Sequence, residues 1–264
     1  MPPARDSLLI VTPHSSGQVP ADVLRDMLGD AALDTPTRTA FLRRLFLDGD
    51  PYTDLIYALP GARHVNAAWS RFVVDLNRDR DDRVDNGVIK LVDFTRTPLY
   101  PDGFTLSEEA REARLRLLWD AFDRQVTAEL PGAQLLVVGH CMGTHGPALG
   151  HDTGTPRPAI CLMPGEDDAP TFPYEHWPAL QAACEAAFAD VIAASPYERV
   201  TIGEPWQSDT LSLNHFRRSG VPAFGIEVNA GLYLGDGGEP VDAAIRALNA
   251  GFARFADAAL ALLT

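Results

Sequence analysis

The chain has 264 residues, of which 46% are hydrophobic and 22% charged, and its formal net charge at pH 7 is −14. This composition is typical of a globular protein. The negative charge argues against nucleic-acid binding, because phosphate groups require a positively charged surface. An acidic substrate would therefore need a local cationic site.

The sequence shows no division into parts. No linker rich in Pro, Gly and Ser interrupts it, so we expect a single domain over residues 1–264. No apolar run approaches the roughly 18 residues of a membrane span, and residues 1–7 show no signal peptide. An odd number of cysteines favours reduced thiols over a disulfide framework. These features predict a cytoplasmic protein without a membrane partner, and they leave the oligomeric state open.

The first hundred residues predict two strands and at least one helix. The apolar run of residues 7–12 predicts a buried strand that leads into a loop. Residues 22–47 combine helical spacing with Thr and Pro interruptions, which favours one or two short helices. A second strand is expected within residues 63–76, centred on the β-favouring residues 72–74. Residues 89–100 predict an irregular segment.

The rest of the sequence alternates helices and strands. A helix is expected from Thr105 to Leu130, where Glu108 is spaced for a capping box with Thr105 and Pro131 follows the helix end. Four more elements follow: a strand at 134–138, a helix at 177–194, a strand at 223–228 and an amphipathic helix at 240–263. This alternation predicts an α/β fold with a mixed, mostly parallel sheet and helices on both faces.

Two histidines follow expected strands. His14 comes after the first strand and His140 after the strand at 134–138. Ligand sites of such sheets lie at the carboxyl ends of the strands, and neutral imidazole is a common zinc ligand. A lone histidine is more often a surface or core residue, so the pair only indicates a site.

A charged run follows the expected second strand, in the sequence RFVVDLNRD of residues 71–79. The guanidinium of Arg78 matches a carboxylate in shape, and the neighbouring Asn77 adds a neutral donor for the same anion. Asp75 is placed to orient Arg78 or the loop. On spacing alone, a solvated charged turn at the end of a strand is the better explanation.

Glu227 lies in the apolar run AFGIEVN. Its carboxylate either points out to solvent or lies beside a metal ion as a general base, because an unpaired buried carboxylate is costly. Cys141 follows His140 but shows no separate activating partner, so its role stays open, as does that of His145.

Six segments, taken together and in order, resemble the N-formylglutamate amidohydrolase family, whose fold is similar to that of zinc carboxypeptidases. They are VTPHSSGQVP (11–20), DPYTDLIY (50–57), SRFVVDLNRDRDD (70–82), TPLY (97–100), GHCM (139–142) and GIEVNAGLY (225–233). The segments containing DLNRD and IEVN are the most specific in combination.

The resemblance implies a zinc-dependent site, or a site for another divalent transition metal. His14 and His140 correspond to metal ligands. Asn77 and Arg78, helped by Arg71, correspond to the residues that hold the substrate carboxylate.

The resemblance also assigns Glu227 as the general base that activates the attacking water. It leaves the third metal ligand open, because zinc carboxypeptidases carry a Glu where this chain has Gly17. Asp54 and Asp50 are the candidates, with Asp54 preferred for its match to the family pattern. Relatives read Asp-Leu-His-Ser-Met where residues 138–142 read VGHCM, so an acidic partner expected for the histidine is missing.

The implied reaction is hydrolysis of the linear amide of a small N-acyl amino acid. N-formyl-L-glutamate, which would give L-glutamate and formate, is the first choice. One alternative is a different carboxylate-bearing amide from a specialised pathway, cut at the same metal site. Another is a non-catalytic relative that binds carboxylates. In each case the partner is a small anion.

Overall fold

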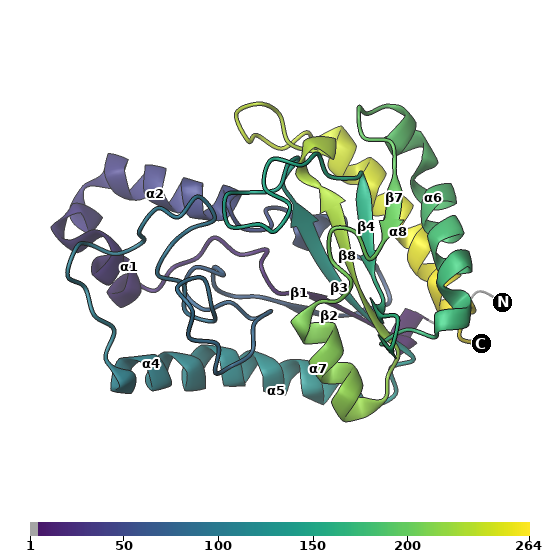
Figure 1. Ribbon diagram of the computed structural model, residues 1–264, viewed down its shortest axis with the longest axis horizontal. Coiled ribbons are helices and arrows are strands. Elements are labelled where there is room, and N and C mark those ends of the chain that lie inside the picture. The colour runs from purple at the N-terminus through teal and green to yellow at the C-terminus, as the bar shows by residue number, and fades with distance from the viewer. Residues whose placement is uncertain (1–4) are drawn as a thin grey trace.

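The computed structural model describes residues 5–264, and within them the largest sheet has six strands in the order β2-β1-β3-β8-β4-β7 (Figure 1). The parallel strands are β1 (Leu8–Thr12), β2 (Arg63–Asn66), β3 (Leu135–Met142) and β8 (Ala223–Asn229). β4 (Ile160–Met163) is antiparallel to β8, and β7 (Val200–Ile202) is parallel to β4. The predicted mixed, mostly parallel sheet is confirmed.

Helices cover both faces of this sheet, as predicted. The α-helices of residues 5–264, including those that lie beside the sheet, are α1 (Ala21–Leu28), α2 (Thr35–Leu47), α3 (Thr53–Ile56), α4 (Glu108–Arg114), α5 (Asp120–Glu129), α6 (Trp177–Ala193), α7 (Thr210–Ser219) and α8 (Asp242–Ala261). Apolar residues of α3, α6 and α8 form one core with the sheet, whereas α5 and α7 contribute to the core on the other face. In Figure 1, α6 and α8 lie on the right and α5 and α7 lie below the strands.

The inner strands β1, β3, β8 and β4 are largely apolar because both of their faces are buried. In β1, Leu8 and Ile10 belong to the core with α6 and α8, and Leu9 and Val11 belong to the opposite core. This alternation is the two-residue period of an extended strand. Because the residues on both faces of β1 are buried in a core, its sequence is a continuous apolar run.

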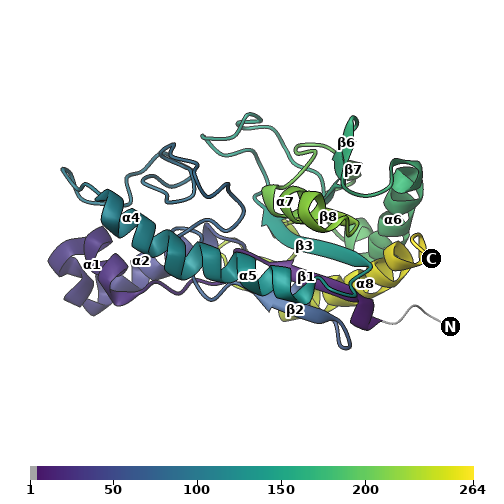
Figure 2. The ribbon, with the colours of Figure 1, turned by 90° about the horizontal axis from the view of Figure 1, so that it is seen from below.

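A third apolar cluster lies beside the sheet, where α1, α2 and α4 extend away from the strands in both views (Figure 2). It contains Phe72 and Val73, which form a turn together with Arg71. The strand predicted within residues 63–76 is present as β2, but its placement at residues 72–74 is wrong. Phe72 and Val73 belong to one buried apolar cluster with Val23 and Leu45. Their apolar character therefore reflects tertiary packing and not a strand.

The helix predicted from Thr105 begins at Glu108 instead. Ser107 is its cap, because its side chain accepts a hydrogen bond from the backbone N–H of Ala110 at 3.2 Å. A turn of π-helix at residues 115–119 joins α4 to α5, which ends at Glu129, before the predicted Pro-Gly stop. β4, β7 and α7 were not predicted.

Two further findings concern the described residues as a whole. Cys141, Cys161 and Cys184 are free. Among residues 5–264, no helix has both the length and the apolar character needed to cross a membrane.

The strand order places the crevice of the sheet next to β1. After β1 the chain passes to β2 on one side, and it later enters β3 on the other side of β1. Ligands of open α/β sheets bind where the strand order reverses in this way, outside the carboxyl ends of the strands. The carboxyl ends of β1 and β3 are therefore the first place to look for a site.

Candidate active site

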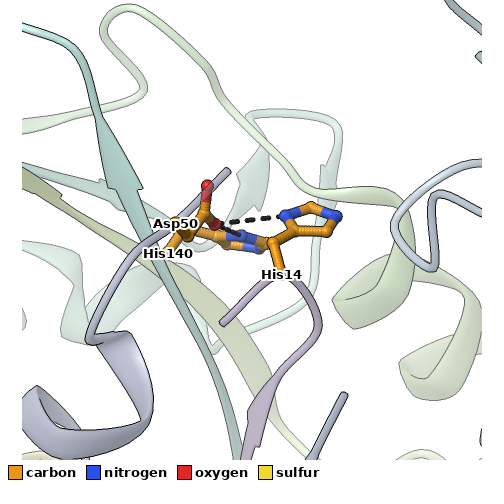
Figure 3. A group of neighbouring side chains, drawn as sticks. All are labelled: His14, Asp50 and His140. Atoms are coloured by element: carbon orange, nitrogen blue, oxygen red, sulfur yellow. Dashed lines mark hydrogen bonds and ion pairs between the residues drawn. The ribbon is translucent and has the colours of Figure 1, made fainter. Parts of the chain in front are cut away.

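His14, Asp50 and His140 meet at this position and are all buried (Figure 3). One carboxylate oxygen of Asp50, Oδ2, lies 3.1 Å from Nδ1 of His14 and 3.0 Å from Nδ1 of His140. The ligand atoms of the three side chains lie within 4.8 Å of one another. Residues from three distant parts of the sequence thus face a common point.

The fold positions each of the three residues through its backbone. His14 lies two residues beyond β1, and its carbonyl accepts a hydrogen bond from the N–H of Asp50 at 3.2 Å. His140 lies within β3 and not beyond it, and its carbonyl accepts a hydrogen bond from the Tyr57 hydroxyl at 2.8 Å. A Cβ at Gly139 would lie 2.3 Å from the Tyr57 ring, so this position requires glycine.

The structure brings Asp50, and not the preferred Asp54, to the two histidines. Asp54 lies in α3, is partly exposed, and is outside the His14–Asp50–His140 cluster. Asp50 precedes α3, and its backbone N–H is hydrogen-bonded to the distant residue His14, whereas Asp54 lies four residues later within the helix.

The second ring nitrogen of His14 contacts a buried ion-pair network. Nε2 of His14 lies 2.7 Å from Oδ1 of Asp75. Oδ2 of Asp75 lies 2.9 Å from both the Arg71 guanidinium and the Lys90 ammonium, and Lys90 is completely buried. Arg71 also pairs with Asp50 at 3.3 Å, so it joins the two carboxylates. This network fixes the orientation of the His14 ring.

The network determines the charge state of its carboxyl groups. Burial by itself would raise the pKa of Asp75, but Arg71, Lys90 and His14 hold it well below its usual value. Burial likewise opposes ionisation of Asp50, yet His14, His140 and Arg71 lower its pKa. Burial lowers the pKa of the Lys90 ammonium to about 8, against the opposing effect of Asp75. Both aspartates are therefore carboxylates at neutral pH.

Glu227 lies next to His140, in register with it on the neighbouring strand β8. Its side chain lines the same cleft, and its Oε2 is buried without a hydrogen-bond partner within residues 5–264. Burial raises the pKa of Glu227 to about 7, despite the lowering effect of His140. A carboxyl group with a pKa near neutrality can both accept and return a proton, which is what a general base and acid requires.

The cleft beside this cluster has a volume of about 410 Å³ and is lined by Arg71, Asn77 and Arg78 among others. The guanidinium of Arg78 makes no hydrogen bond or ion pair to another residue between 5 and 264, so it is available to an anion. Asn77 is held in place, because its Oδ1 accepts from the N–H of Leu211 at 2.8 Å. Arg71 is in the cleft wall but is already paired with Asp50 and Asp75.

The sequence did not predict the ion pairs of Asp75 or the part that Lys90 takes in the buried network. Asp75 does orient its own loop, through the N–H of Asn77 at 3.0 Å, but it contacts Arg71 and His14 and not Arg78. The spacing of Arg71 and Asp75, four residues apart, was the available signal. Lys90 carried a weaker one, as a lysine between two apolar residues.

Cys141 also lines the cleft, next to the cluster. Burial and the charge of Asp50 raise the pKa of its thiol well above the usual value. A thiolate nucleophile needs a lowered pKa, so this environment does not favour one. His145, the other residue whose role stayed open, lines the cleft as well.

The donor set of the cluster fits a divalent metal ion. Two imidazoles and one carboxylate form a set that zinc takes in hydrolytic enzymes, with the remaining position open. Metal-binding histidines usually donate their other ring N–H to a carboxylate, and His14 has Asp75 in that position. His140 has the Asn77 amide nitrogen near its Nε2 instead, at 3.4 Å.

Comparison with known proteins identifies the family. The sequence profile of the N-formylglutamate amidohydrolase family matches residues 6–234, which is most of the chain. The chain belongs to the N-formylglutamate amidohydrolase family. The resemblance inferred from the sequence motifs is confirmed.

Members of the N-formylglutamate amidohydrolase family include relatives of this chain from pseudomonads. The N-formylglutamate deformylase of Pseudomonas putida is 31% identical over 153 residues, which cover 54% of this chain and 54% of that protein. The N-formylglutamate deformylase of Pseudomonas aeruginosa is 34% identical over 100 residues, which cover 34% of this chain and 38% of that protein. The chain therefore spans about half, or less, of the length of the curated relatives it matches.

A solved structure shares the fold over a longer stretch. The crystal structure of N-formylglutamate amidohydrolase from Ralstonia eutropha superposes with a TM-score of 0.70 at 20% sequence identity. The superposition covers 95% of this chain and 92% of that one. At this level of identity the likeness concerns the fold.

Proposed function

We propose that this protein hydrolyses the amide bond of a small N-acyl amino acid, with N-formyl-L-glutamate as the first choice, to give L-glutamate and formate. The observation that carries the proposal is the buried His14–Asp50–His140 cluster, with Glu227 beside it, in a cleft of a chain from this family. The names of the Pseudomonas relatives support the same reaction.

We further propose that His14, Asp50 and His140 hold a divalent metal ion, with zinc expected. When bound, such an ion supplies a Lewis acid that polarises a carbonyl oxygen and makes water more acidic. Asp75 would keep the His14 ring in the orientation and tautomer that leave Nδ1 free for the metal.

Glu227 is the residue we assign to proton transfer. In hydrolysis the water oxygen bonds to the carbonyl carbon and the bond from this carbon to the amide nitrogen breaks. Glu227 takes the proton that the water loses and returns it to the leaving nitrogen, so the atoms balance as one acid and one amine. Its buried Oε2, which has no other hydrogen-bond partner in residues 5–264, is free to do so.

Arg78, with Asn77 beside it, is the residue pair we assign to the substrate carboxylate. The Arg78 guanidinium has no partner among residues 5–264 and lines the cleft, and a guanidinium binds a carboxylate through two parallel hydrogen bonds. Arg71 has a different part: its ion pairs with Asp50 and Asp75 stabilise the carboxylates of the cluster.

The direct test is a steady-state assay of the zinc-loaded protein with a panel of N-formyl and N-acetyl amino acids. We expect turnover of N-formyl-L-glutamate, and loss of activity when a chelator removes the metal. Turnover of a different member of the panel would indicate another amide as substrate. No turnover of any member, with bound metal confirmed by elemental analysis, would contradict the proposal and favour a carboxylate-binding protein.

The carboxylate assignment has its own test. Arg78→Ala should raise KM by roughly 10- to 100-fold, because a charge-assisted pair is lost. Arg83→Ala is the matched control, since Arg83 is a nearby arginine in an exposed ion pair with Glu108. Equal KM values for both variants would rule out the role of Arg78.

A further inference from the structure

Arg157 is a third arginine of the cleft, after Arg71 and Arg78, and the mechanism above does not use it. It precedes β4, its side chain is only 5% exposed, and it lines the cleft together with Trp206. Asp152 holds one edge of the guanidinium, accepting from Nε at 2.8 Å and from Nη2 at 3.0 Å. The Arg157 Cζ lies 4.4 Å from the centre of the Trp206 ring. The guanidinium is thus fixed along one edge and over one face.

The remaining edge of this guanidinium is unused. Within residues 5–264, no group accepts a hydrogen bond from Nη1 of Arg157. Nη1 and the outer hydrogen of Nη2 form a second fork that fits a carboxylate in the same way as the fork facing Asp152. A buried arginine with a free fork on a cleft is prepared for an anionic group that the protein itself does not supply.

The sheet places this fork next to the reacting centre. In the strand order, His14 follows β1, His140 lies in β3, Glu227 lies in β8 and Arg157 precedes β4. Because β4 is antiparallel to β8, its first residue Ile160 pairs with Val228 at the carboxyl end of β8. Arg157 therefore lies at the same edge of the sheet as Glu227, one strand further along.

Arg78 enters the cleft from a different element. It follows the turn at residues 71–73, and Asn77 beside it is bonded to α7. Arg71 is already paired with Asp50 and Asp75. The other two arginines of the cleft, Arg78 and Arg157, line the same cavity as Glu227. Two separated cationic groups match a ligand with two separated carboxylates.

We propose that Arg157 is a specificity-determining residue that binds a second, side-chain carboxylate of the substrate. This inference rests on the proposed function, because it names the substrate group that Arg157 recognises. Asp152 and Trp206 act as positioning residues that keep the guanidinium ordered before the ligand arrives, which lowers the entropy cost of binding.

The experiment is a calorimetric binding measurement with two product amino acids, and it requires no turnover. Zinc-loaded wild-type protein is titrated with L-glutamate and with L-glutamine, which differ in side-chain charge. We expect L-glutamate to bind more tightly, and Arg157→Gln to weaken it by roughly 10- to 100-fold with little change for L-glutamine. Arg157→Lys should recover part of the preference, because it keeps the charge but loses the fork.

Arg5→Gln is the matched control. Arg5 binds Asp257 with the same two-point geometry, Nε to one oxygen and Nη2 to the other at 2.7 Å each, but it precedes β1 at the opposite edge of the sheet. This variant should keep the full preference for L-glutamate.

The inference is overturned if wild-type protein shows no preference for L-glutamate, or if the preference survives in folded Arg157→Gln. Should this variant fail to fold, Trp206→Leu takes its place and should reduce the preference by about 3-fold through a less ordered Arg157; an unchanged preference would again contradict the inference. Failure of the proposed function gives a different result. In that case no amide is hydrolysed, whereas the Arg157-dependent preference in binding is still observed.

Discussion

Two buried carboxyl groups flank the histidine cluster, and their surroundings are opposite. Asp75, on the side of the β2–β3 connection, has His14, Arg71 and Lys90 within hydrogen-bond distance. Glu227, on β8, has an oxygen that is buried and unpartnered among the described residues. The pKa of Asp75 is held well below its usual value, whereas burial raises that of Glu227 to about 7.

The difference separates a structural carboxylate from a reactive one. Asp75 cannot take up a proton near neutral pH without losing two ion pairs, so it serves to hold His14 and to balance two cations. Glu227 has no such partners within residues 5–264, and its protonation near neutral pH costs little free energy. Carboxyl groups of the same type thus have different roles because of their neighbours alone.

The largest expected effect comes from removing the reactive carboxylate. Glu227→Gln should lower kcat by between 10² and 10⁴-fold, because general acid–base catalysis contributes about this much. The zinc content and the melting temperature should stay close to those of the wild type, because Glu227 makes no ion pair with any residue between 5 and 264. Steady-state kinetics with elemental analysis checks this. A variant that retains most of its kcat would show that the base lies elsewhere.

The next effect concerns the structural carboxylate. Asp75→Asn removes the buried counter-charge of Lys90 and leaves Arg71 paired with Asp50 alone, which should lower the free energy of unfolding by about 4 kcal/mol. Zinc affinity should fall by roughly 10- to 100-fold, because the His14 ring loses its orienting carboxylate. Urea unfolding and competitive chelator titration measure the two quantities.

Ser107→Ala is the control for this comparison. It removes a helix cap outside the site and should lower the free energy of unfolding by about 1 kcal/mol without changing zinc affinity. If Asp75→Asn likewise leaves zinc affinity unchanged, then Asp75 does not orient the ligand.

The smallest expected effect is a pH dependence in the metal-free protein. The pKa of Glu227 is about 7 in the folded chain, against an ordinary value of 4.5, so the folded state binds the proton more tightly. Its contribution to stability is therefore complete below pH 4.5 and is lost as the pH rises through 7, by about 3 kcal/mol in total.

Urea unfolding of wild type and Glu227→Gln in the presence of a chelator, at pH 5 and pH 8, isolates this contribution. Other titrating groups are common to both proteins, so the wild type should lose stability relative to Glu227→Gln between these two pH values. A constant difference would mean that Glu227 is not buried as a neutral acid.

Local patterns in the sequence predicted the elements that are continuous along the chain. β1, β8, α6 and α8 were expected close to their observed positions, because their hydrophobic periods are long and uninterrupted. The prediction failed at residues 72–74, where apolar side chains pack a turn against a separate helical cluster. The hydrophobic period and the strand propensity describe only the local backbone, so they do not predict packing against residues that are distant in the sequence.

The same distinction applies to the site. His14, His140 and Glu227 were recognisable in the sequence because each follows or lies in a strand and matches a family pattern, and Arg78 was recognisable from the family pattern alone. The choice of Asp50 over Asp54 was decided by tertiary structure, through a backbone hydrogen bond to His14. So were the network of Asp75 and Lys90 and the free fork of Arg157, because the distance between charges and the burial of each exist only in the folded chain.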